Sequence, residues 1–449
     1  TTTRILAALF LAAGLAACDE GDDGNATDVP AADNATDIAS ENGGPVVVTV
    51  DADLSASTTW PAGSQVTLKK HVFVTGGTLT IEPGVTVLGE AGTSLVITPA
   101  ARLVAEGTAA DPIVFTSAQP AGTRAAGNWG GVVLLGSVPI NVTGGTEKVE
   151  GFPATAAQTN YGGTAANHDC GSLKYVRIEF AGFELAPDNE LNGLTVAGCG
   201  SATKIDHVQV HKGADDGIEM FGGTADLKHI VISQPDDDGL DWDFGWTGRV
   251  QFLTVQQNGI VGDKGMECDN NKNDNDAAPR SMPEIWNATL VGSDSEPGTA
   301  GKSQAAIHFR RGTAAKVNNA ILAHFTDDGI QVDDEATKAQ ADAGTLFLKT
   351  SIFWDIKNDT ASLPASSGVD GFDAAAFFTG AALANRVVDP MLADALDLAA
   401  PDFTPKAGSP ALTGAGTPPA DGFFDTSATF VGAFGTDDWT AGWTAFPAN

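Results

Sequence analysis

Short apolar runs, interrupted by glycine, asparagine and aspartate, make up most of this chain from Val46 onward. Examples are the runs at residues 46–48, 79–81, 95–97 and 113–115. Apolar runs this short, bounded by turn-forming residues, are typical of buried strands. Only the Ala-rich stretch from Ala336 to Ala343 has a helical tendency, and we interpret it as a loop. The pattern therefore predicts an all-β protein.

Two apolar strands recur along the chain. The first occupies residues 175–178, 207–210, 229–232 and 252–255, with later copies at 287–290, 319–322 and 351–354. The second occupies residues 192–196, 216–220, 238–242 and 264–268, with weaker copies at 306–310 and 328–333. A period of 22 to 26 residues, without the regular Leu/Asn consensus of leucine-rich repeats, indicates one coil of a right-handed parallel β-helix. Longer intervals, such as residues 269–280, are expected to be inserted loops.

Side chains alternate between two faces along the second strand, so the repeat predicts which of them share a face. The expected core residues are Ile218, Leu240, Met266, Ile307 and Ile330, with Met220, Trp242, Cys268, Phe309 and Val332 two positions on. Between them lie two outward columns: Glu219, Asp241, Glu267, His308 and Gln331, and Phe221, Asp243, Asp269, Arg310 and Asp333. Cys268 is thus predicted to be a buried, unpaired thiol that packs as a small apolar group.

The acidic composition excludes some classes of partner. Asp and Glu number 57 against 24 Lys and Arg, and the formal net charge is −33. A surface this negative repels nucleic acid and anionic lipid headgroups, and it favours divalent cations. No segment approaches 18 consecutive apolar residues, so we expect no transmembrane span.

The N-terminal stretch is similar to a bacterial lipoprotein signal. Arg4 precedes an apolar segment from Ile5 to Leu15, which is too short for a membrane span but suits a secretory signal. The run Leu15-Ala16-Ala17-Cys18 resembles a lipobox, and this resemblance implies cleavage after residue 17 and lipidation of Cys18.

Three regions follow from this interpretation: a signal peptide at residues 1–17, a disordered acidic tether at 18–44 and a β-helix domain at 45–449. Acyl chains on Cys18 would anchor an exported protein to the lipid bilayer of the cell envelope. The outer membrane is the expected location, and the leaflet is left open.

Two of the other cysteines have matching surroundings. Cys170-Gly171-Ser172 and Cys199-Gly200-Ser201 would fall at the same corner of neighbouring coils, so we predict a disulfide between Cys170 and Cys199. No Cys-x-x-Cys pair or Cys/His cluster is present, which argues against a zinc site.

The acidic columns allow two interpretations. Asp, Asn and Gly are the residues that tight turns require, and this explains Asp215, Asp216, Asp237, Asp238, Asp327 and Asp328. It explains the carboxylates within the strands less well, because like charges on neighbouring strands destabilise a sheet. Either some of these carboxyls have raised pKa values or a cation bridges them. The expected metal is Ca²⁺, held by Glu219, Asp241, Asp243, Glu267 and Asp269.

Several longer motifs resemble a group of exported bacterial right-handed β-helix proteins, many of them lipoproteins, whose biochemical role is unknown to us. The matching stretches are residues 129–136, 149–153, 189–195, 215–223 and 438–443. The likeness extends from about residue 72 to the C-terminus. It implies the fold and export, and it implies little about function.

The leading functional hypothesis is non-catalytic binding of a glycan or other extracellular ligand, aided by Ca²⁺. Candidate ligand-binding residues are Phe221 and Trp246, as exposed aromatic platforms, with His308 and Arg310. A structural or adhesive spacer without a ligand is a further alternative. The C-terminal aromatics Phe423, Phe424, Phe430, Phe434, Trp439, Trp443 and Phe446 are expected to cap the open end of the β-helix.

The enzymatic alternative is a glycoside hydrolase or polysaccharide lyase. Polygalacturonase-like hydrolases pair Asp residues on adjacent coils with a His and a basic residue, and pectate-type lyases use bridged carboxylates with a basic residue. The candidate catalytic residues are Asp241, Glu267, His308 and Arg310. The Asn-Thr-Asp and Gly-His-Gly motifs of the hydrolases are missing, so binding without catalysis is favoured.

Overall fold

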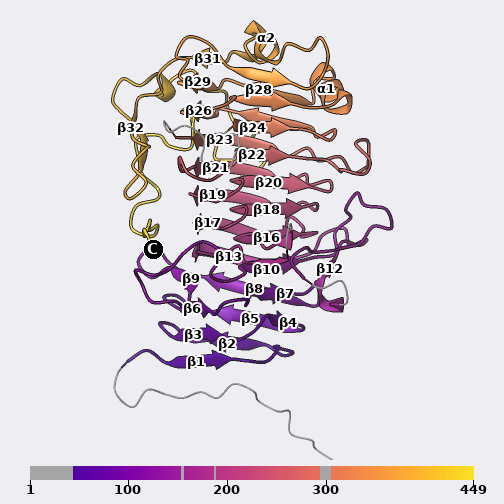
Figure 1. Ribbon diagram of the computed structural model, residues 1–449, viewed down its shortest axis with the longest axis vertical. Coiled ribbons are helices and arrows are strands. Elements are labelled where there is room, and N and C mark those ends of the chain that lie inside the picture. Colours follow the sequence, from indigo (N-terminus) through magenta and orange to yellow (C-terminus); the bar gives the residue numbers. More distant parts are fainter. Residues whose placement is uncertain (1–43, 153–155, 187–188, 294–304) are drawn as a thin grey trace, which may run out of the picture. The chain divides into compact units, whose positions relative to one another are not determined.

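The computed structural model describes residues 44–152, 156–186, 189–293 and 305–449. The expected signal peptide, Cys18 and all of the tether but Gly44 lie outside these ranges. Nearly all regular structure in the described residues is parallel β-strand, and the strands stack in successive coils (Figure 1). The prediction of an all-β parallel β-helix is confirmed.

One wall of the solenoid is a ten-stranded parallel sheet to which each coil adds one strand. Its strands, in stacking order, are β4 (Val72–Val74), β7 (Leu95–Ile97), β10 (Val132–Leu135), β16 (Leu194–Ala197), β18 (Ile218–Phe221), β20 (Leu240–Asp243), β22 (Lys264–Cys268), β24 (Ala305–Phe309), β27 (Ile330–Val332) and β30 (Ala365–Ser367). These strands contain the second repeat of the sequence. The ten-stranded sheet therefore carries both outward columns.

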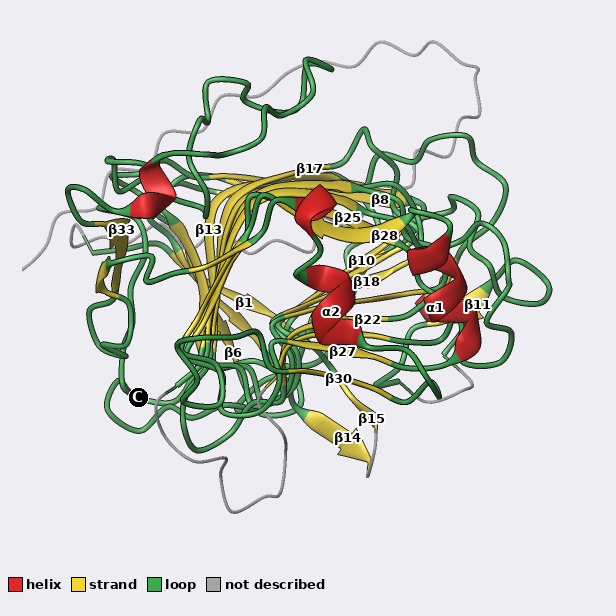
Figure 2. Ribbon diagram, turned by 90° about the horizontal axis from the view of Figure 1, so that it is seen from above, coloured by secondary structure: helices red, strands yellow, loops and turns green. Residues whose placement is uncertain are grey.

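The remaining walls form one seventeen-stranded sheet. It contains β1 (Val47–Val50), β2 (Thr58–Trp60), β3 (Gln65–Leu68), β5 (Gly77–Ile81), β6 (Thr86–Gly89), β8 (Ala101–Glu106), β9 (Ile113–Ser117), β13 (Gly171–Glu179), β17 (Lys204–His211), β19 (Asp226–Ser233), β21 (Arg249–Gln256), β23 (Glu284–Val291), β25 (Ala315–Asn318), β26 (Ile321–Ala323), β28 (Leu346–Lys349), β29 (Ile352–Trp354) and β31 (Arg386–Val387). Two narrow faces meet in β13, because its first half pairs with β8 and its second half with β9. Figure 2 shows this bent wall from above.

The wall bends at a column of stacked residues that have the left-handed backbone conformation. Tyr175, His207, His229, Phe252, Asn287, Asn319 and Thr350 each have a φ between 48° and 64° at this position. Side chains other than glycine seldom adopt this backbone conformation, and Asn and His are the commoner exceptions. The four aromatic members of the column lie ring against ring: the centroids of Tyr175 and His207 are 4.4 Å apart in a tilted pair, and His207 and His229 stack at 4.2 Å. The stacking supports the bend in each coil.

The core follows the predicted alternation. All ten predicted core residues, from Ile218 to Val332, are fully buried. Cys268 is among them and is a free thiol, as predicted. The strands are in register, so Glu219 lies beside Asp241, Asp241 beside Glu267, and Glu267 beside His308.

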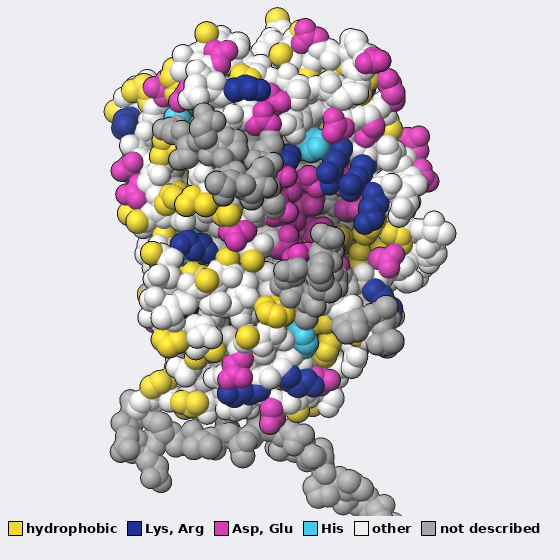
Figure 3. All heavy atoms as spheres, viewed as in Figure 1, with side chains coloured by type: hydrophobic (Ala, Val, Ile, Leu, Met, Phe, Trp, Pro, Cys, Tyr) yellow, Lys and Arg dark blue, Asp and Glu magenta, His cyan; other side chains and the backbone are white. Residues whose placement is uncertain are grey.

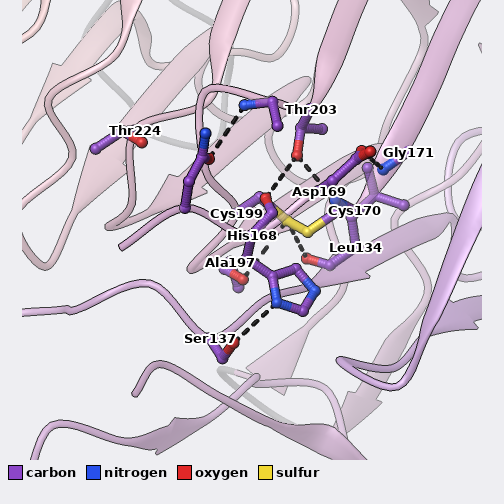
Figure 4. Close-up of a disulfide and its surroundings, with 12 residues drawn as sticks. Leu134, Ser137, His168, Asp169, Cys170, Gly171, Ala197, Cys199, Thr203 and Thr224 are labelled. Carbon is purple, nitrogen blue, oxygen red and sulfur yellow. Dashed lines mark hydrogen bonds between the residues drawn. A yellow bond between two sulfur atoms is a disulfide. The ribbon is translucent and has the colours of Figure 1, made fainter. Parts of the chain in front are cut away.

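A disulfide joins neighbouring coils where the sequence predicts it (Figure 4). Cys170 and Cys199 are bonded, with their Cα atoms 5.9 Å apart, and both are fully buried. The Thr203 hydroxyl donates to the His168 carbonyl at 3.2 Å and accepts from the Cys170 amide at 2.9 Å. The bridge therefore fixes the start of β13 against the coil above it.

Two short helices lie at the last coils. The Ala-rich stretch, which we interpreted as a loop, forms α1 (Glu335–Asp342), and the Asp334 side chain caps it by accepting from the Thr337 amide at 2.9 Å. Helix α2 (Ala374–Phe378) packs on β27 and β30, and the Phe378 ring stacks on Phe309 of the core. Within the described ranges, no helix has the length and apolarity that crossing a membrane requires.

The C-terminal aromatics do not cap the end of the solenoid, so that prediction is wrong. Residues 388–449, here named the C-terminal strap, run back along the outside of the seventeen-stranded sheet, past β26, β23 and β21 to β17 and β13 (Figure 1). Asn319 donates to the Gly416 carbonyl at 2.9 Å, and Gln209 donates to the Ala445 carbonyl at 2.7 Å. The strap covers the outer column because its aromatics find stacking partners there, and α2 covers the last coil instead.

Truncation of Trp443 tests how much the strap contributes to the stability of the fold. Its ring lies 5.9 Å from Tyr175 and 5.7 Å from His207, its side chain is buried, and its carbonyl accepts from Arg177. We expect Trp443→Ala to lower the free energy of unfolding by about 3–5 kcal/mol, as for other buried aromatic truncations. Hydrogen exchange should accelerate in β13 and β17 and stay unchanged in β31.

Ile260→Ala is the control, because that side chain is 74% exposed and its loss should cost under about 0.5 kcal/mol. Faster exchange at β31 than at β13 after the Trp443 substitution would mean that the strap stabilises the end of the solenoid after all.

Candidate functional site

The outer face of the ten-stranded sheet changes character along the solenoid. In the lower coils its outward residues are apolar, and Val96, Val133 and Leu135 lie buried beneath an inserted loop that contains Ile140 and Tyr161. From β18 to β27 the outward residues are charged or polar, except for Phe221 of β18. Figure 3 shows acidic side chains gathered on this face, with basic side chains and a histidine beside them.

Two groups of three carboxylates lie at the centre of this face. Asp216, Glu219 and Asp241 form one group, and Asp238, Asp241 and Glu267 form the other. Within each group the oxygen atoms lie within 4.8 Å of one another. Asp241 of β20 belongs to both groups, so four other carboxyls surround it and the two groups together contain five residues. We name these five residues the carboxylate cluster.

The sequence predicts three members of the carboxylate cluster by their columns and leaves two as turn residues. Asp216 and Asp238 do serve the turns, because Asp216 accepts from the Asp238 amide at 2.9 Å and Asp238 accepts from the Lys264 amide at 2.6 Å. They also reach the strand carboxylates. Their two roles cannot be separated from sequence, since any Asp in a tight turn has the same signature.

Burial and mutual repulsion raise the pKa values of most of the cluster. Desolvation is the larger cause and neighbouring carboxylates the next: Glu267 for Asp241 and Asp238, Glu150 for Glu219, and Asp215 for Asp216. The pKa of each of these four carboxyls lies well above its ordinary value. Without a counter-charge, the folded protein therefore keeps part of this cluster protonated.

Glu267 differs from its neighbours. Burial alone would raise the pKa of Glu267, but His308 and Arg310 lower it by more, so it lies below the ordinary value. The Arg310 guanidinium pairs with Glu267 and, through Nε, with Asp269 at 2.7 Å. His308 Nε2 lies 2.8 Å from Asp333, and its Nδ1 lies 3.7 Å from Glu267. Arg310 and His308 thus line one side of the cluster.

Asp243 and Asp269, also predicted as metal ligands, lie outside the two groups. Arg310 and Arg311 both pair with Asp269, so a bridge already satisfies that carboxylate. Asp243 is buried, which together with the charge of Asp269 raises its pKa to about 8, although its bond from the Phe244 amide lowers it. Sequence columns alone do not distinguish these residues from the cluster.

Two contributors come from segments far away in the chain. Glu150 belongs to the loop after β10, and its pKa is raised by burial although its interaction with Glu219 lowers it. Asn192, just before β16, donates from Nδ2 to Glu219 Oε2 at 2.5 Å. Glu150 has no signal in the repeat pattern, whereas Asn192 opens the first copy of the second repeated strand without being marked there as a partner of Glu219. Only the long motifs at residues 149–153 and 189–195 mark them.

One oxygen of the cluster stands out. Among the described residues, Asp241 Oδ1 is a buried side-chain oxygen without a hydrogen-bond partner. A buried carboxylate oxygen without a partner carries a desolvation cost of about 1–3 kcal/mol or more. The oxygen lies where the two carboxylate groups meet, so a ligand that bound there would remove that cost.

The predicted aromatic platforms are wrong. Trp246 is fully buried, donates from its indole nitrogen to the Ala225 carbonyl at 3.0 Å and packs against Trp242 in the core. Phe221 points outward as predicted, but it is only 6% exposed, because Tyr161 of the inserted loop and Phe244 cover it. Inserted loops are long enough to cover a face that the strand pattern alone would leave open.

The comparisons with known proteins match the geometry of the fold. The family model of the pectate-lyase-like β-helix domain matches residues 52–389, which include every strand of the carboxylate cluster. No curated protein and no solved structure matches the chain significantly.

Stability should fall as pH rises, because the folded state binds protons that the unfolded state releases. Asp243 titrates at about 8 in the folded protein and at about 4 when unfolded, so its contribution is complete below about pH 4 and is lost as pH rises toward 8. Asp243→Asn should leave stability unchanged near pH 4 and raise it by about 1–3 kcal/mol near pH 9 in chelator.

Urea unfolding at both pH values measures this difference. Asp370→Asn, at an exposed site, should change stability at neither pH. An equal effect of Asp243→Asn at the two pH values would mean that the Asp243 carboxyl titrates normally in the folded protein.

Proposed function

Because this chain belongs to the family of pectate-lyase-like β-helix domains, we propose that it binds an extracellular polysaccharide across the outer face of the ten-stranded sheet, with Ca²⁺ held by the carboxylate cluster. The observation that carries the proposal is the unpaired Asp241 oxygen at the meeting point of two carboxylate groups.

The donor set fits a calcium ion. Ca²⁺ prefers six to eight oxygen ligands and accepts several carboxylates in flexible arrangements. Asp216, Glu219, Asp238, Asp241 and Glu267 supply carboxylate oxygens only, without the nitrogen or sulfur ligands that favour zinc. A bound divalent ion would offset the repulsion that raises their pKa values. It would also present free coordination positions to acidic or hydroxyl groups of a sugar.

Binding is favoured over lyase catalysis by the state of Arg310. A lyase needs a basic residue that can take a proton. Burial lowers the pKa of Arg310, but Asp269 and Glu267 raise it by more, so it lies above the ordinary value. Both carboxylates also occupy its nitrogen atoms. Arg310 therefore acts as a positioning residue for Glu267.

Hydrolysis is the second candidate, and one observation favours it. Asp241 and Glu267 lie in the same group, yet the pKa of Asp241 is raised and that of Glu267 is lowered. Pairs of carboxyls with pKa values pushed apart are the usual acid and base of glycosidases. In that role Asp241 would donate the proton and Glu267 would act as the ionised partner.

The lipid anchor expected at Cys18 completes the proposal. An acylated Cys18 would hold the domain at the cell envelope, where polysaccharides are within reach.

Calcium binding should stabilise the folded state. We expect Ca²⁺ at 100 times its Kd to add about 2.7 kcal/mol to the free energy of unfolding, and chelation to remove it. Asp241→Asn should abolish this response, because Asp241 belongs to both carboxylate groups. The same variant should be more stable than the wild type in chelator at neutral pH, since an amide neither repels its neighbours nor has the raised pKa that destabilises the folded state. Thermal unfolding with and without Ca²⁺ measures both effects.

A double substitution, Asp370→Asn with Asp437→Asn, is the matched control, because it removes two exposed carboxylates that belong to neither carboxylate group. It should keep the full calcium response. An unchanged melting temperature of the wild type across millimolar Ca²⁺ would refute the metal part of the proposal.

The hydrolase candidate has a separate test. If it holds, Asp241→Asn and Glu267→Gln should each lower the release of reducing ends from polysaccharides by about 10²–10⁴-fold. The products should lack the ultraviolet absorbance of unsaturated sugars. Absence of released ends from wild-type protein that still binds the same polysaccharide would leave binding as the function.

A further inference from the structure

A group of metal-binding side chains lies on a different face, where the seventeen-stranded sheet bends beneath the C-terminal strap. Asp206 and His207 belong to β17, and His229 of β19 is the repeat equivalent of His207, one coil further on. The repeat pattern does not mark this group, because the histidines are scattered along the sequence. Stacking of the coils brings two of them together.

Both imidazoles face one carboxylate. His207 Nδ1 lies 2.9 Å and His229 Nδ1 lies 2.7 Å from the same oxygen atom, Asp206 Oδ1. With one donor atom from each residue, the three donor atoms all lie within 4.8 Å of one another. Two imidazoles and a carboxylate form a three-ligand set, which in zinc proteins leaves the fourth position of the ion to water or a ligand.

Small movements are enough to place one ion among the three donor atoms. The two imidazoles stack with an interplanar angle of 30°. A zinc–nitrogen bond is about 2.0–2.1 Å long, so the two Nδ1 atoms must lie within about 4.2 Å of each other. Rotation about the last side-chain bond allows this approach, because histidine has a broad energy minimum there. The proton on each Nδ1 then moves to Nε2, so both imidazoles stay neutral.

The Asp206 carboxylate is accessible to an ion from solvent. Its side chain is 35% exposed, and it lines a groove of about 530 Å³ between the sheet and the strap. Lys228 is its neighbour in the strand register, but the Lys228 ammonium donates to the Phe423 carbonyl at 2.8 Å instead. Among the described residues, neither a lysine nor an arginine pairs with Asp206. A metal ion can therefore reach this carboxylate from the groove.

We propose that Asp206, His207 and His229 bind a divalent transition-metal ion, for which zinc is the probe. Imidazole nitrogen and carboxylate oxygen are donors that suit zinc, whereas Ca²⁺ prefers oxygen ligands alone. The site is thus distinct from the carboxylate cluster in place and in chemistry. The ion ties two coils together beneath the strap, where Trp443 packs edge-on against His207 and Trp439 against His229.

Calorimetric titration with zinc at about pH 7.5 tests the proposal, because an imidazole of ordinary pKa is neutral there. Millimolar Ca²⁺ in the buffer competes for sites made of oxygen ligands and leaves imidazole sites open. We expect one zinc ion to bind with a Kd below about 10 µM, and Mg²⁺ to leave this site empty. In nuclear magnetic resonance spectra of the seven histidines, zinc should shift the ring-nitrogen signals of His207 and His229 only.

Two variants remove a ligand and keep its surroundings. His229→Phe keeps a ring in the stacked column, where Phe252 holds the equivalent position of the next coil with the same left-handed backbone. Asp206→Asn keeps an oxygen that accepts from both imidazoles. Each variant should weaken zinc binding about 100-fold or more, because loss of a residue that only orients a ligand already costs about 10–100-fold.

His324→Asn is the matched control. His324 also has the left-handed backbone, and its Nδ1 lies 3.2 Å from one carboxylate, that of Asp355. Within the described ranges, it belongs to no group of three potential metal ligands. Asparagine tolerates the left-handed backbone, so this variant should fold and keep its zinc affinity within about two-fold of wild type.

Zinc binding of wild-type strength in both the His229→Phe and Asp206→Asn variants would overturn the proposal, as would zinc shifts confined to other histidines such as His308. Absence of zinc binding by the wild type would also overturn it, and Asp206 would then serve only as a hydrogen-bond acceptor for the two imidazoles. These outcomes are distinct from a failure of the calcium proposal, which the Asp241→Asn variant reports.

Discussion

Parallel, in-register stacking of coils is the constraint on which the rest of this structure depends. Each coil places a strand beside the equivalent strand of the next, at the spacing of about 4.8 Å that backbone hydrogen bonds require. A side chain therefore lies beside the equivalent side chain of the next coil, whatever its charge. Apolar residues gain from this arrangement, as the buried column from Ile218 to Ile330 shows. Aromatic residues gain as well, as the stacked rings of His207 and His229 show.

The same stacking destabilises carboxylates, because it places like charges side by side. This repulsion is concentrated in the carboxylate cluster. Glu219, Asp241 and Glu267 are neighbours because the ladder makes them so, and the turns add Asp216 and Asp238. Arg310 and His308 contact Glu267 and offset this repulsion on one side of the cluster only. On the other side, Glu219 and Asp241 keep raised pKa values, and Asp241 Oδ1 has no hydrogen-bond partner among the described residues. Such unrelieved repulsion destabilises the fold, so a function at this face is the simplest reason for its presence.

The C-terminal strap adds a surface that the repeat does not contain. It crosses successive coils and accepts hydrogen bonds from Asn287, Asn319 and Gln209 through its backbone. These bonds satisfy outward polar side chains of the seventeen-stranded sheet, and the strap shields the bent column from water. Where the strap meets β19 and β21, it also forms one edge of a second groove.

The sequence by itself determined the solenoid, its core and the register of its outward columns. The reason is that each repeated strand pairs in parallel with its equivalent in the next coil. It also determined the disulfide, since Cys170 and Cys199 sit at equivalent points of the repeat. Only the tertiary structure decided what covers each face. The inserted loop buried Phe221 and brought Glu150 to Glu219, and the strap passed along the side of the solenoid rather than over its end. Loops and the strap lack the repeat, and their positions depend on long-range packing that no local pattern encodes.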